Sequence, residues 1–111
     1  MATKTERLND IVKTYERFEK EEMRRLGIDF GQTDGDGFWM PTNLEMAIEF
    51  LKLIKNKGIV QSPAPIVDAG SGDGRMLAVL DVFGFSPVIG IESDKNLYLA
   101  SKYMISDLEM R

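Results

Sequence analysis

A single glycine-rich stretch places the strongest constraint on how this chain folds. Residues 66–69 (Ile-Val-Asp-Ala) form a short apolar run typical of a buried strand, and residues 70–74 read Gly-Ser-Gly-Asp-Gly. Three glycines in five residues indicate a backbone with unusual dihedral angles that a ligand can approach closely. The apolar spacing after this turn predicts a helix that ends before Gly84. The stretch therefore predicts a strand, a ligand-binding turn and a helix.

A second buried strand is predicted at residues 88–91, where Val-Ile-Gly-Ile is apolar and partly β-branched. It is followed by Glu92. The carboxyl ends of parallel strands lie side by side in a βαβ unit, so Glu92 is expected beside the glycine turn, where it can accept hydrogen bonds from ribose hydroxyls. The expected fold class is α/β, a Rossmann-like parallel sheet with flanking helices, of which two strands are predicted.

Two classes of cofactor suit this geometry, and the glycine spacing distinguishes them. The dinucleotide fingerprint is G-x-G-x-x-G, with a pyrophosphate on the helix N-terminus. In this chain Asp68 precedes Gly70, Gly72 and Gly74, and Arg75 occupies the place of the fingerprint's third glycine. An NAD-binding oxidoreductase is therefore the disfavoured alternative.

The pattern acid-x-G-x-G-x-G, with an acid after the second strand, resembles the class I S-adenosylmethionine (SAM)-dependent methyltransferases. Residues 67–75 (Val-Asp-Ala-Gly-Ser-Gly-Asp-Gly-Arg) and 90–92 (Gly-Ile-Glu) fit this pattern without a gap. The variant is most similar to the branch of non-SET protein-lysine methyltransferases. The resemblance implies SAM as the cofactor and a protein, an RNA or a small molecule as the methyl acceptor.

SAM has a sulfonium cation, an amino-acid tail and an adenosine, but no phosphate. Gly70 and Gly72 would let the backbone pack against the methionyl chain, while Asp68 and Glu92 would meet the ammonium and the ribose. In the similar methyltransferases an aromatic-x-Pro-Thr sequence, here residues 39–42, lies against the cofactor. The predicted cofactor-binding residues are Trp39, Met40, Thr42, Asp68, Gly70, Ser71, Gly72, Gly74, Glu92 and Ser93.

Three further helices are predicted over residues 3–26, 44–57 and 94–109, the last of them capped by Asp94 or Ser93. Capping boxes at Thr3 and Thr42 open the first two, so the Thr42 hydroxyl is either a cap or a contact to the methionyl carboxylate. The first helix would be roughly 35 Å long. It is interpreted as a packing helix, with a substrate-side or oligomerising appendage as the alternative.

The chain divides into an N-terminal amphipathic helix (1–27), a glycine- and aspartate-rich loop with the following helix (28–58), and the first half of a SAM-binding domain (59–111). The aspartates of the loop do not match a calcium-binding EF-hand in any register, so no metal site is predicted.

Composition excludes several classes of chemistry. There is no cysteine or histidine, which removes disulfides, thiolate zinc sites, cysteine nucleophiles and an imidazole base. The net charge of −4 disfavours a dedicated nucleic-acid binder. No apolar run is long enough for a membrane span or a signal peptide, so a cytoplasmic protein without a membrane partner is expected.

The sheet of the resembled family has more strands than the two predicted here, and its acceptor-binding residues follow a later strand. Catalytic residues are therefore left unassigned and are expected beyond residue 111. The chain is interpreted as the N-terminal part of a longer enzyme, or as one that completes its sheet by self-association. A non-catalytic SAM-binding or oligomerising module is the other reading.

Overall fold

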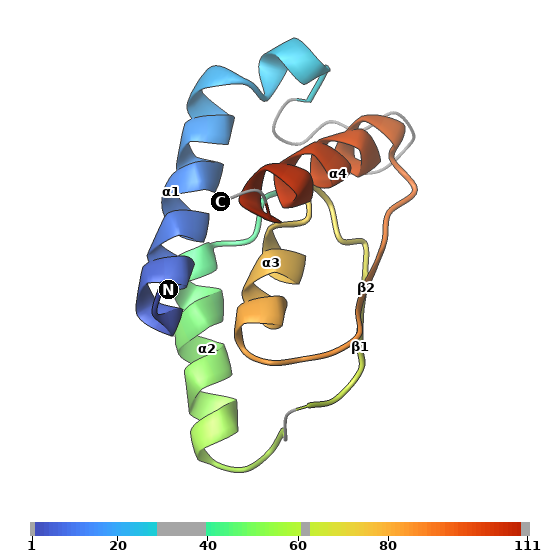
Figure 1. The fold of residues 1–111 in the computed structure, drawn as a ribbon. Coiled ribbons are helices and arrows are strands. Elements are labelled where there is room, and N and C mark those ends of the chain that lie inside the picture. The colour runs from blue at the N-terminus through green and yellow to red at the C-terminus, as the bar shows by residue number, and fades with distance from the viewer. Residues whose placement is uncertain (1, 29–39, 61–62, 110–111) are drawn as a thin grey trace.

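The computed structural model describes residues 2–28, 40–60 and 63–109. Within these ranges the chain is mixed α/β, with four α-helices, one short 3-10 helix and a two-stranded sheet (Figure 1). The elements are α1 (Lys4–Glu21), η1 (Arg24–Leu26), α2 (Leu44–Asn56), β1 (Ile66–Ala69), α3 (Arg75–Val82), β2 (Val88–Ile91) and α4 (Lys95–Glu109). None of the described helices has the length and apolarity that a membrane span requires.

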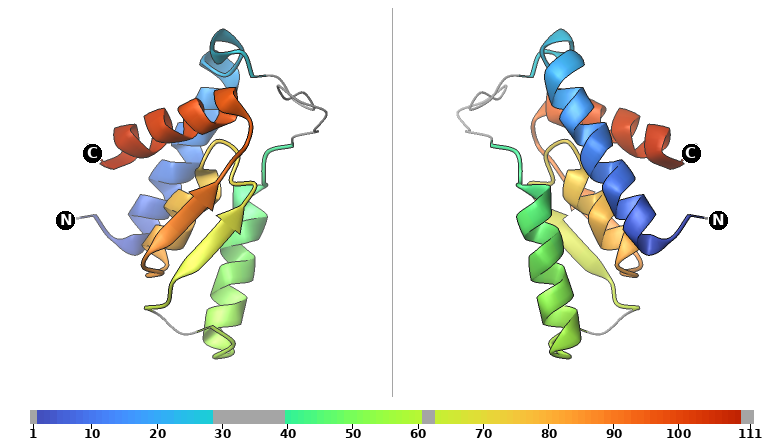
Figure 2. Two further views of the ribbon diagram at one scale, coloured as in Figure 1. Left: turned by 90° about the vertical axis from the view of Figure 1, so that its right-hand side faces the viewer. Right: turned by 90° about the vertical axis from the view of Figure 1, so that its left-hand side faces the viewer.

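The two strands are parallel and begin and end in register, with Ile66 beside Val88 and Ala69 beside Ile91. Both carboxyl ends therefore lie at the same edge, as a βαβ connection through α3 requires. The helices α1, α2 and α3 lie on one side of the sheet, and the left view of Figure 2 looks onto the opposite, uncovered side. Apolar side chains on that side stay exposed, with Val67 at 55% and Ile91 at 58%.

The hydrophobic core lies around α3, which packs between α1 and the sheet. Val79 of α3 has no exposed surface, and Tyr15 and Phe18 of α1 are each 1% exposed. Burial of side chains of this size contributes roughly 1.5–3 kcal/mol each. The core therefore fixes α1 against α3, as expected of a packing helix.

The first helix ends earlier than the sequence predicts. The α-helix stops at Glu21, and the backbone N–H groups of residue 22 and of Met23 both donate to the Phe18 carbonyl. This wide turn leads into η1 and brings both Met23 and Ile28 into the core, each 2% exposed. The prediction of one helix over 3–26 was wrong because burial of these two side chains favours a turn over a straight helix. The 18 residues of α1 span about 27 Å.

The helix caps agree with the sequence in two cases and differ in one. Thr3 accepts a hydrogen bond from the Glu6 N–H at 3.1 Å, and Asp94 accepts one from the Leu97 N–H at 2.9 Å. The cap of α2 is Asn43 rather than Thr42, because the Asn43 side chain accepts from the backbone N–H of residue 46 at 3.1 Å. The Thr42 hydroxyl therefore does not cap this helix.

The cap assignment predicts different costs for two neighbouring substitutions. Asn43→Ala removes the acceptor for an orphan amide of α2, so the free energy of unfolding should fall by about 1 kcal/mol. Thr42→Ala should cost less than half as much, since its side chain is exposed and does not cap the helix. Urea unfolding of both variants measures the difference; a larger loss for Thr42→Ala would contradict the assignment.

Candidate functional site

The glycine turn wraps around the carboxyl end of β2. Gly70, Gly72 and Gly74 have φ angles of 77°, 58° and 83°, a left-handed region in which other residues are strained. The N–H groups of Gly70 and Ser71 both donate to the Ile91 carbonyl, at 2.7 and 3.0 Å. The turn is therefore held at the edge of the sheet where both strands end.

Glu92 lies beside this turn, where the βαβ geometry predicts it. One carboxylate oxygen accepts a hydrogen bond from the Gly72 N–H at 2.7 Å. The other accepts from the Asp94 N–H at 2.9 Å. A carboxylate has about four acceptor positions, so two remain for further donors such as a pair of hydroxyls.

Asp68 is the second half-buried acid at this edge. It pairs with Gly90 in the sheet, just before the turn. Burial, and then the nearby charge of Glu92, raise the pKa of the Asp68 carboxyl above its usual value. Among the residues that the structure describes, neither carboxylate has a Lys or Arg within ion-pair distance. The edge therefore carries negative charge that a bound cation would stabilise.

Two of the predicted site residues have packing roles inside the protein. The Ser71 side chain lies over Gly90, where a Cβ would come within 2.8 Å of its hydroxyl oxygen. A Cβ on Gly74 would meet the side chain of Ser101, so this glycine allows α3 and α4 to approach. At Gly70, by contrast, an added Cβ would meet nothing within 4 Å. Of these three residues, Gly70 offers open space to a ligand.

The segment before α2 contacts the start of α3 through Thr42. Its carbonyl accepts a hydrogen bond from Nη1 of Arg75 at 3.4 Å, which places this exposed residue against the first turn of α3. Met40 is 60% exposed, and Ser93 is exposed beside Glu92. Trp39 lies outside the described residues.

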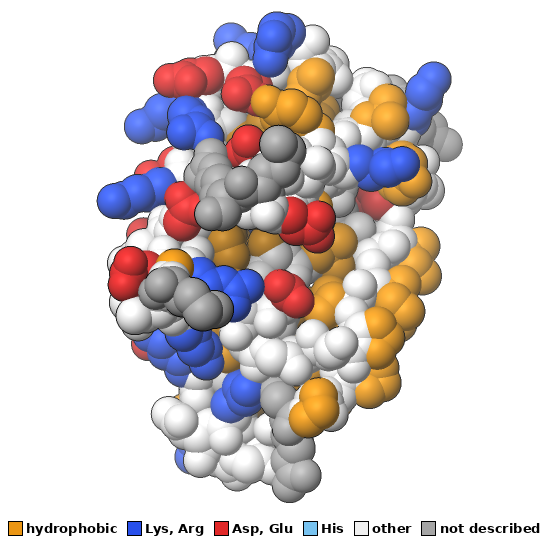
Figure 3. All heavy atoms as spheres, in the orientation of Figure 1, with side chains coloured by type: hydrophobic (Ala, Val, Ile, Leu, Met, Phe, Trp, Pro, Cys, Tyr) orange, Lys and Arg blue, Asp and Glu red, His pale blue; other side chains and the backbone are white. Residues whose placement is uncertain are grey.

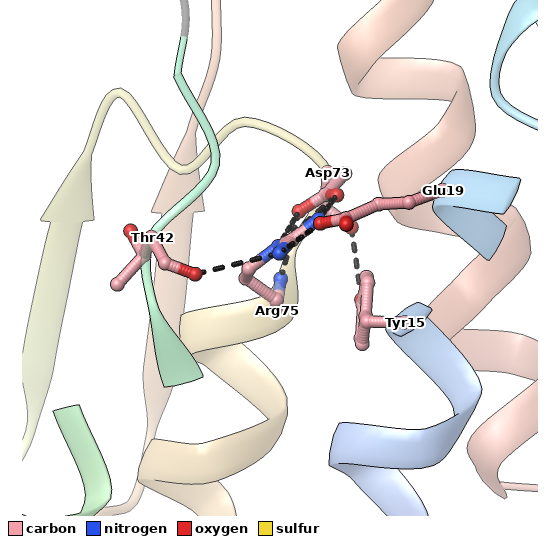
Figure 4. Close-up of polar contacts among 5 residues, drawn as sticks. All are labelled: Tyr15, Glu19, Thr42, Asp73 and Arg75. Carbon is pink, nitrogen blue, oxygen red and sulfur yellow. Dashed lines mark hydrogen bonds and ion pairs between the residues drawn. The ribbon is translucent and has the colours of Figure 1, made fainter. Parts of the chain in front are cut away.

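Sequence reasoning missed the pair that anchors the turn, Asp73 and Arg75 (Figure 4). Nε of Arg75 donates to both Asp73 carboxylate oxygens, at 3.1 and 3.2 Å, and Nη2 donates to one of them at 2.7 Å. Nη1 donates to Glu19 of α1 at 2.7 Å. Although burial lowers the pKa of Arg75, its hydrogen bonds and charge interactions with Asp73 and then Glu19 outweigh burial and raise it.

Tyr15 of α1 completes this buried network. Its hydroxyl donates to the Asp73 carbonyl at 2.9 Å, and the Arg75 guanidinium lies 5.1 Å from its ring centre. Burial, and then the charge of Asp73, raise the pKa of the Tyr15 hydroxyl, so it stays a donor. Together with Glu19, which follows one helical turn later, Tyr15 presents an aromatic ring and a carboxylate to the turn. That spacing was the available signal in the sequence, but it does not reveal the partner.

The described residues form no cluster of side chains typical of a metal site. Among the described residues, no group of three or more His, Cys, Asp or Glu side chains could hold a metal ion. Comparison with protein-family models, with curated proteins and with solved structures finds no match for this chain. Any function must therefore be inferred from the site itself.

The network predicts a large loss of stability when Arg75 is removed. Arg75→Ala leaves two carboxylates without their partner, one of them buried, and should lower the free energy of unfolding by about 3–5 kcal/mol. Arg75→Lys keeps the charge but loses the forked geometry, so an intermediate loss is expected. Arg7→Ala is the control, because its 3.5 Å pair with Asp81 is exposed and should contribute less than about 1 kcal/mol. Urea unfolding of the three variants should show this order; equal losses for Arg75→Ala and Arg7→Ala would contradict it.

The raised pKa of Asp68 predicts a pH-dependent gain from Asp68→Asn. Because the folded-state pKa lies above the unfolded value, the charged carboxylate destabilises the fold once the pH exceeds the folded pKa. Asp68→Asn should raise the melting temperature at about pH 7, and the gain should vanish toward about pH 3.5, where the wild-type group is protonated. Glu21→Gln, an exposed acid on α1, serves as the control. A gain from Asp68→Asn that is the same at both pH values would rule out this cause.

Proposed function

We propose that this chain is the cofactor-binding part of a SAM-dependent methyltransferase with a Rossmann-like fold. The observation that carries the proposal is the placement of the glycine turn between two half-buried carboxylates, Asp68 and Glu92, at the common end of two parallel strands. Glu92 is held by two backbone N–H groups with acceptor positions left for ribose hydroxyls. Asp68 supplies the negative charge that suits a ligand with an ammonium group.

The start of α3 favours SAM over a dinucleotide. A pyrophosphate requires free N–H groups at a helix N-terminus, but here the Asp73 carboxylate lies there and accepts from the Arg75 N–H at 3.3 Å. The Arg75 guanidinium is itself engaged by Asp73 and Glu19. Asp68 would also repel an approaching phosphate. A cation-bearing cofactor without phosphate fits this set of charges.

The roles of the chain's own residues follow from this geometry. Bound SAM would supply the activated methyl group, whose transfer depends chiefly on position and local charge. Glu92 would orient the ribose, Asp68 would bind the ammonium, and open space at Gly70 would admit the methionyl chain. The Thr42 hydroxyl, which does not cap α2, would hydrogen-bond the methionyl carboxylate. By resemblance, the methyl acceptor proposed is a protein lysine.

A second candidate function rests on the uncovered face of the sheet. Val67, Ile89 and Ile91 are between 46% and 58% exposed on that side. A non-catalytic SAM-binding module that associates through this face would use the same cofactor site. Sedimentation of the chain with and without SAM distinguishes an associating module from a monomeric cofactor-binding part.

Calorimetric titration of the chain with SAM, its demethylated product S-adenosylhomocysteine and NAD tests the proposal. Micromolar binding of SAM or of the product without NAD binding is expected. A folded chain that binds none of the three, as judged by its circular dichroism and cooperative unfolding, would contradict the proposal. Binding of NAD alone would favour the oxidoreductase reading.

Within this site, Glu92→Ala should weaken SAM binding tenfold or more. The change removes about two charge-assisted hydrogen bonds to the ribose, and 1.4 kcal/mol corresponds to a factor of about ten. Glu21→Ala on the exposed side of α1 is the matched control. Each titration is run at a temperature at which thermal unfolding shows the variant to be folded. This matters because the Glu92 carboxylate also accepts a hydrogen bond from the turn, from the Gly72 N–H. Unchanged affinity in a folded Glu92→Ala chain would remove this residue from the site.

A further inference from the structure

A cavity of about 560 Å³ lies away from the glycine turn, among α1, α3 and α4. Its walls come from the first half of α1, from α3 between Leu77 and Val82, and from the last turns of α4. Val88, the first residue of β2, reaches it, whereas Glu92 and the turn lie at the other end of the strands. The cavity is therefore separate from the candidate cofactor site.

More of the inner surface of the cavity is apolar than polar. Leu77 and Val82 of α3 and Ile105 and Leu108 of α4 are half-buried, so part of each side chain is open to a partner. The larger apolar side chains that line it are Ile11, Leu77, Val82, Val88, Ile105 and Leu108. Small-molecule sites combine such walls with a few polar groups placed inside. Here four of the five charged residues that line the cavity are exposed, namely Glu6, Arg7, Asp81 and Glu109.

The charged residues around the cavity are mostly acidic. They comprise the carboxylates of Glu6, Asp10, Asp81 and Glu109 and one guanidinium, that of Arg7. Arg7 is paired with Asp81 at 3.5 Å, so these two charges offset each other. The exposed carboxylates of Glu6 and Glu109 then give the rim its excess of negative charge. Figure 3 looks onto this face, where hydrophobic side chains are visible between acidic and basic ones.

We propose that this groove docks a basic amphipathic helix of another protein. An apolar stripe at i, i+3, i+4 and i+7 would fill the walls, and flanking Lys or Arg residues would meet the acidic rim. Exposed rim charges mainly set partner choice and association rate rather than raw affinity. The excess of carboxylates therefore selects against an acidic helix of equal hydrophobicity. This proposal stands independently of methyl transfer.

The test uses the 111-residue chain and two labelled synthetic helical peptides. The peptides share one apolar stripe and differ only in flanking Lys or flanking Glu. By fluorescence anisotropy, the Lys peptide should bind at least tenfold more tightly, and its affinity should fall as salt is raised. Equal binding of both peptides, or binding of neither, would overturn the proposal.

Two double variants locate the binding surface. Glu6→Lys with Glu109→Lys reverses charge at the rim and should weaken binding of the Lys peptide about tenfold or more. Glu16→Lys with Glu21→Lys makes the same change in net charge on exposed positions of α1 outside the groove, and should have a much smaller effect. Equal effects of the two double variants would mean that overall charge drives the binding. That result would overturn the proposal that the groove is the binding surface.

Competition and sedimentation test the other occupants. A small apolar amine such as phenethylamine should displace the Lys peptide only at far higher concentration; displacement at a similar concentration would make the cavity a small-molecule site. Sedimentation of the chain alone tests whether a second copy of the chain occupies the groove. Self-association that Glu6→Lys with Glu109→Lys abolishes would assign the groove to a second copy and overturn the proposal.

Discussion

The structure depends on one buried guanidinium. Arg75 joins the glycine turn through Asp73, α1 through Glu19 and the start of α2 through the Thr42 carbonyl. Burying such a charge is costly unless all its donors are matched, and here each guanidinium nitrogen has an acceptor. A different placement of α1 would leave Nη1 of this buried guanidinium without its carboxylate partner, Glu19. Hydrophobic contacts can tolerate a shifted helix, so the polar network sets where α1 lies and the apolar core stabilises it there.

The local elements could be predicted from the sequence, because their signals are contained in short segments. Both strands occupy the predicted residues, 66–69 and 88–91, since apolar β-branched runs bounded by turn residues have few alternatives. The Asp94 cap is local in the same way. The end of the first helix and the cap of the second were predicted wrongly, because burial and a choice between adjacent capping residues decide them. The Rossmann-like identity of the sheet stays a prediction.

The candidate site likewise contains features that short segments of sequence predict and features that depend on distant contacts. The position of Glu92 follows from the βαβ geometry, which is a rule about neighbouring elements. The contact between Arg75 and Glu19 joins residues 56 positions apart, and no single sequence shows such a pair. Likewise, only the structure shows that Gly74 is needed to admit Ser101. A glycine pattern therefore mixes residues that suit a ligand with residues that suit packing.

Asp68, near the end of β1, lowers the stability of the fold when it is charged. Asp68 and Glu92 repel each other in a half-buried position, whereas Asp73, the fourth residue of the turn, has its charge matched by Arg75. A chain that needed only a stable turn could have used an amide in place of the Asp68 carboxyl. Unmatched charge that a cationic ligand would neutralise is instead typical of a binding site, where ligand binding restores stability by mass action. Asp73, which is paired with Arg75, thus anchors the turn. Asp68 and Glu92, which have no cationic partner among the described residues, form the proposed binding surface.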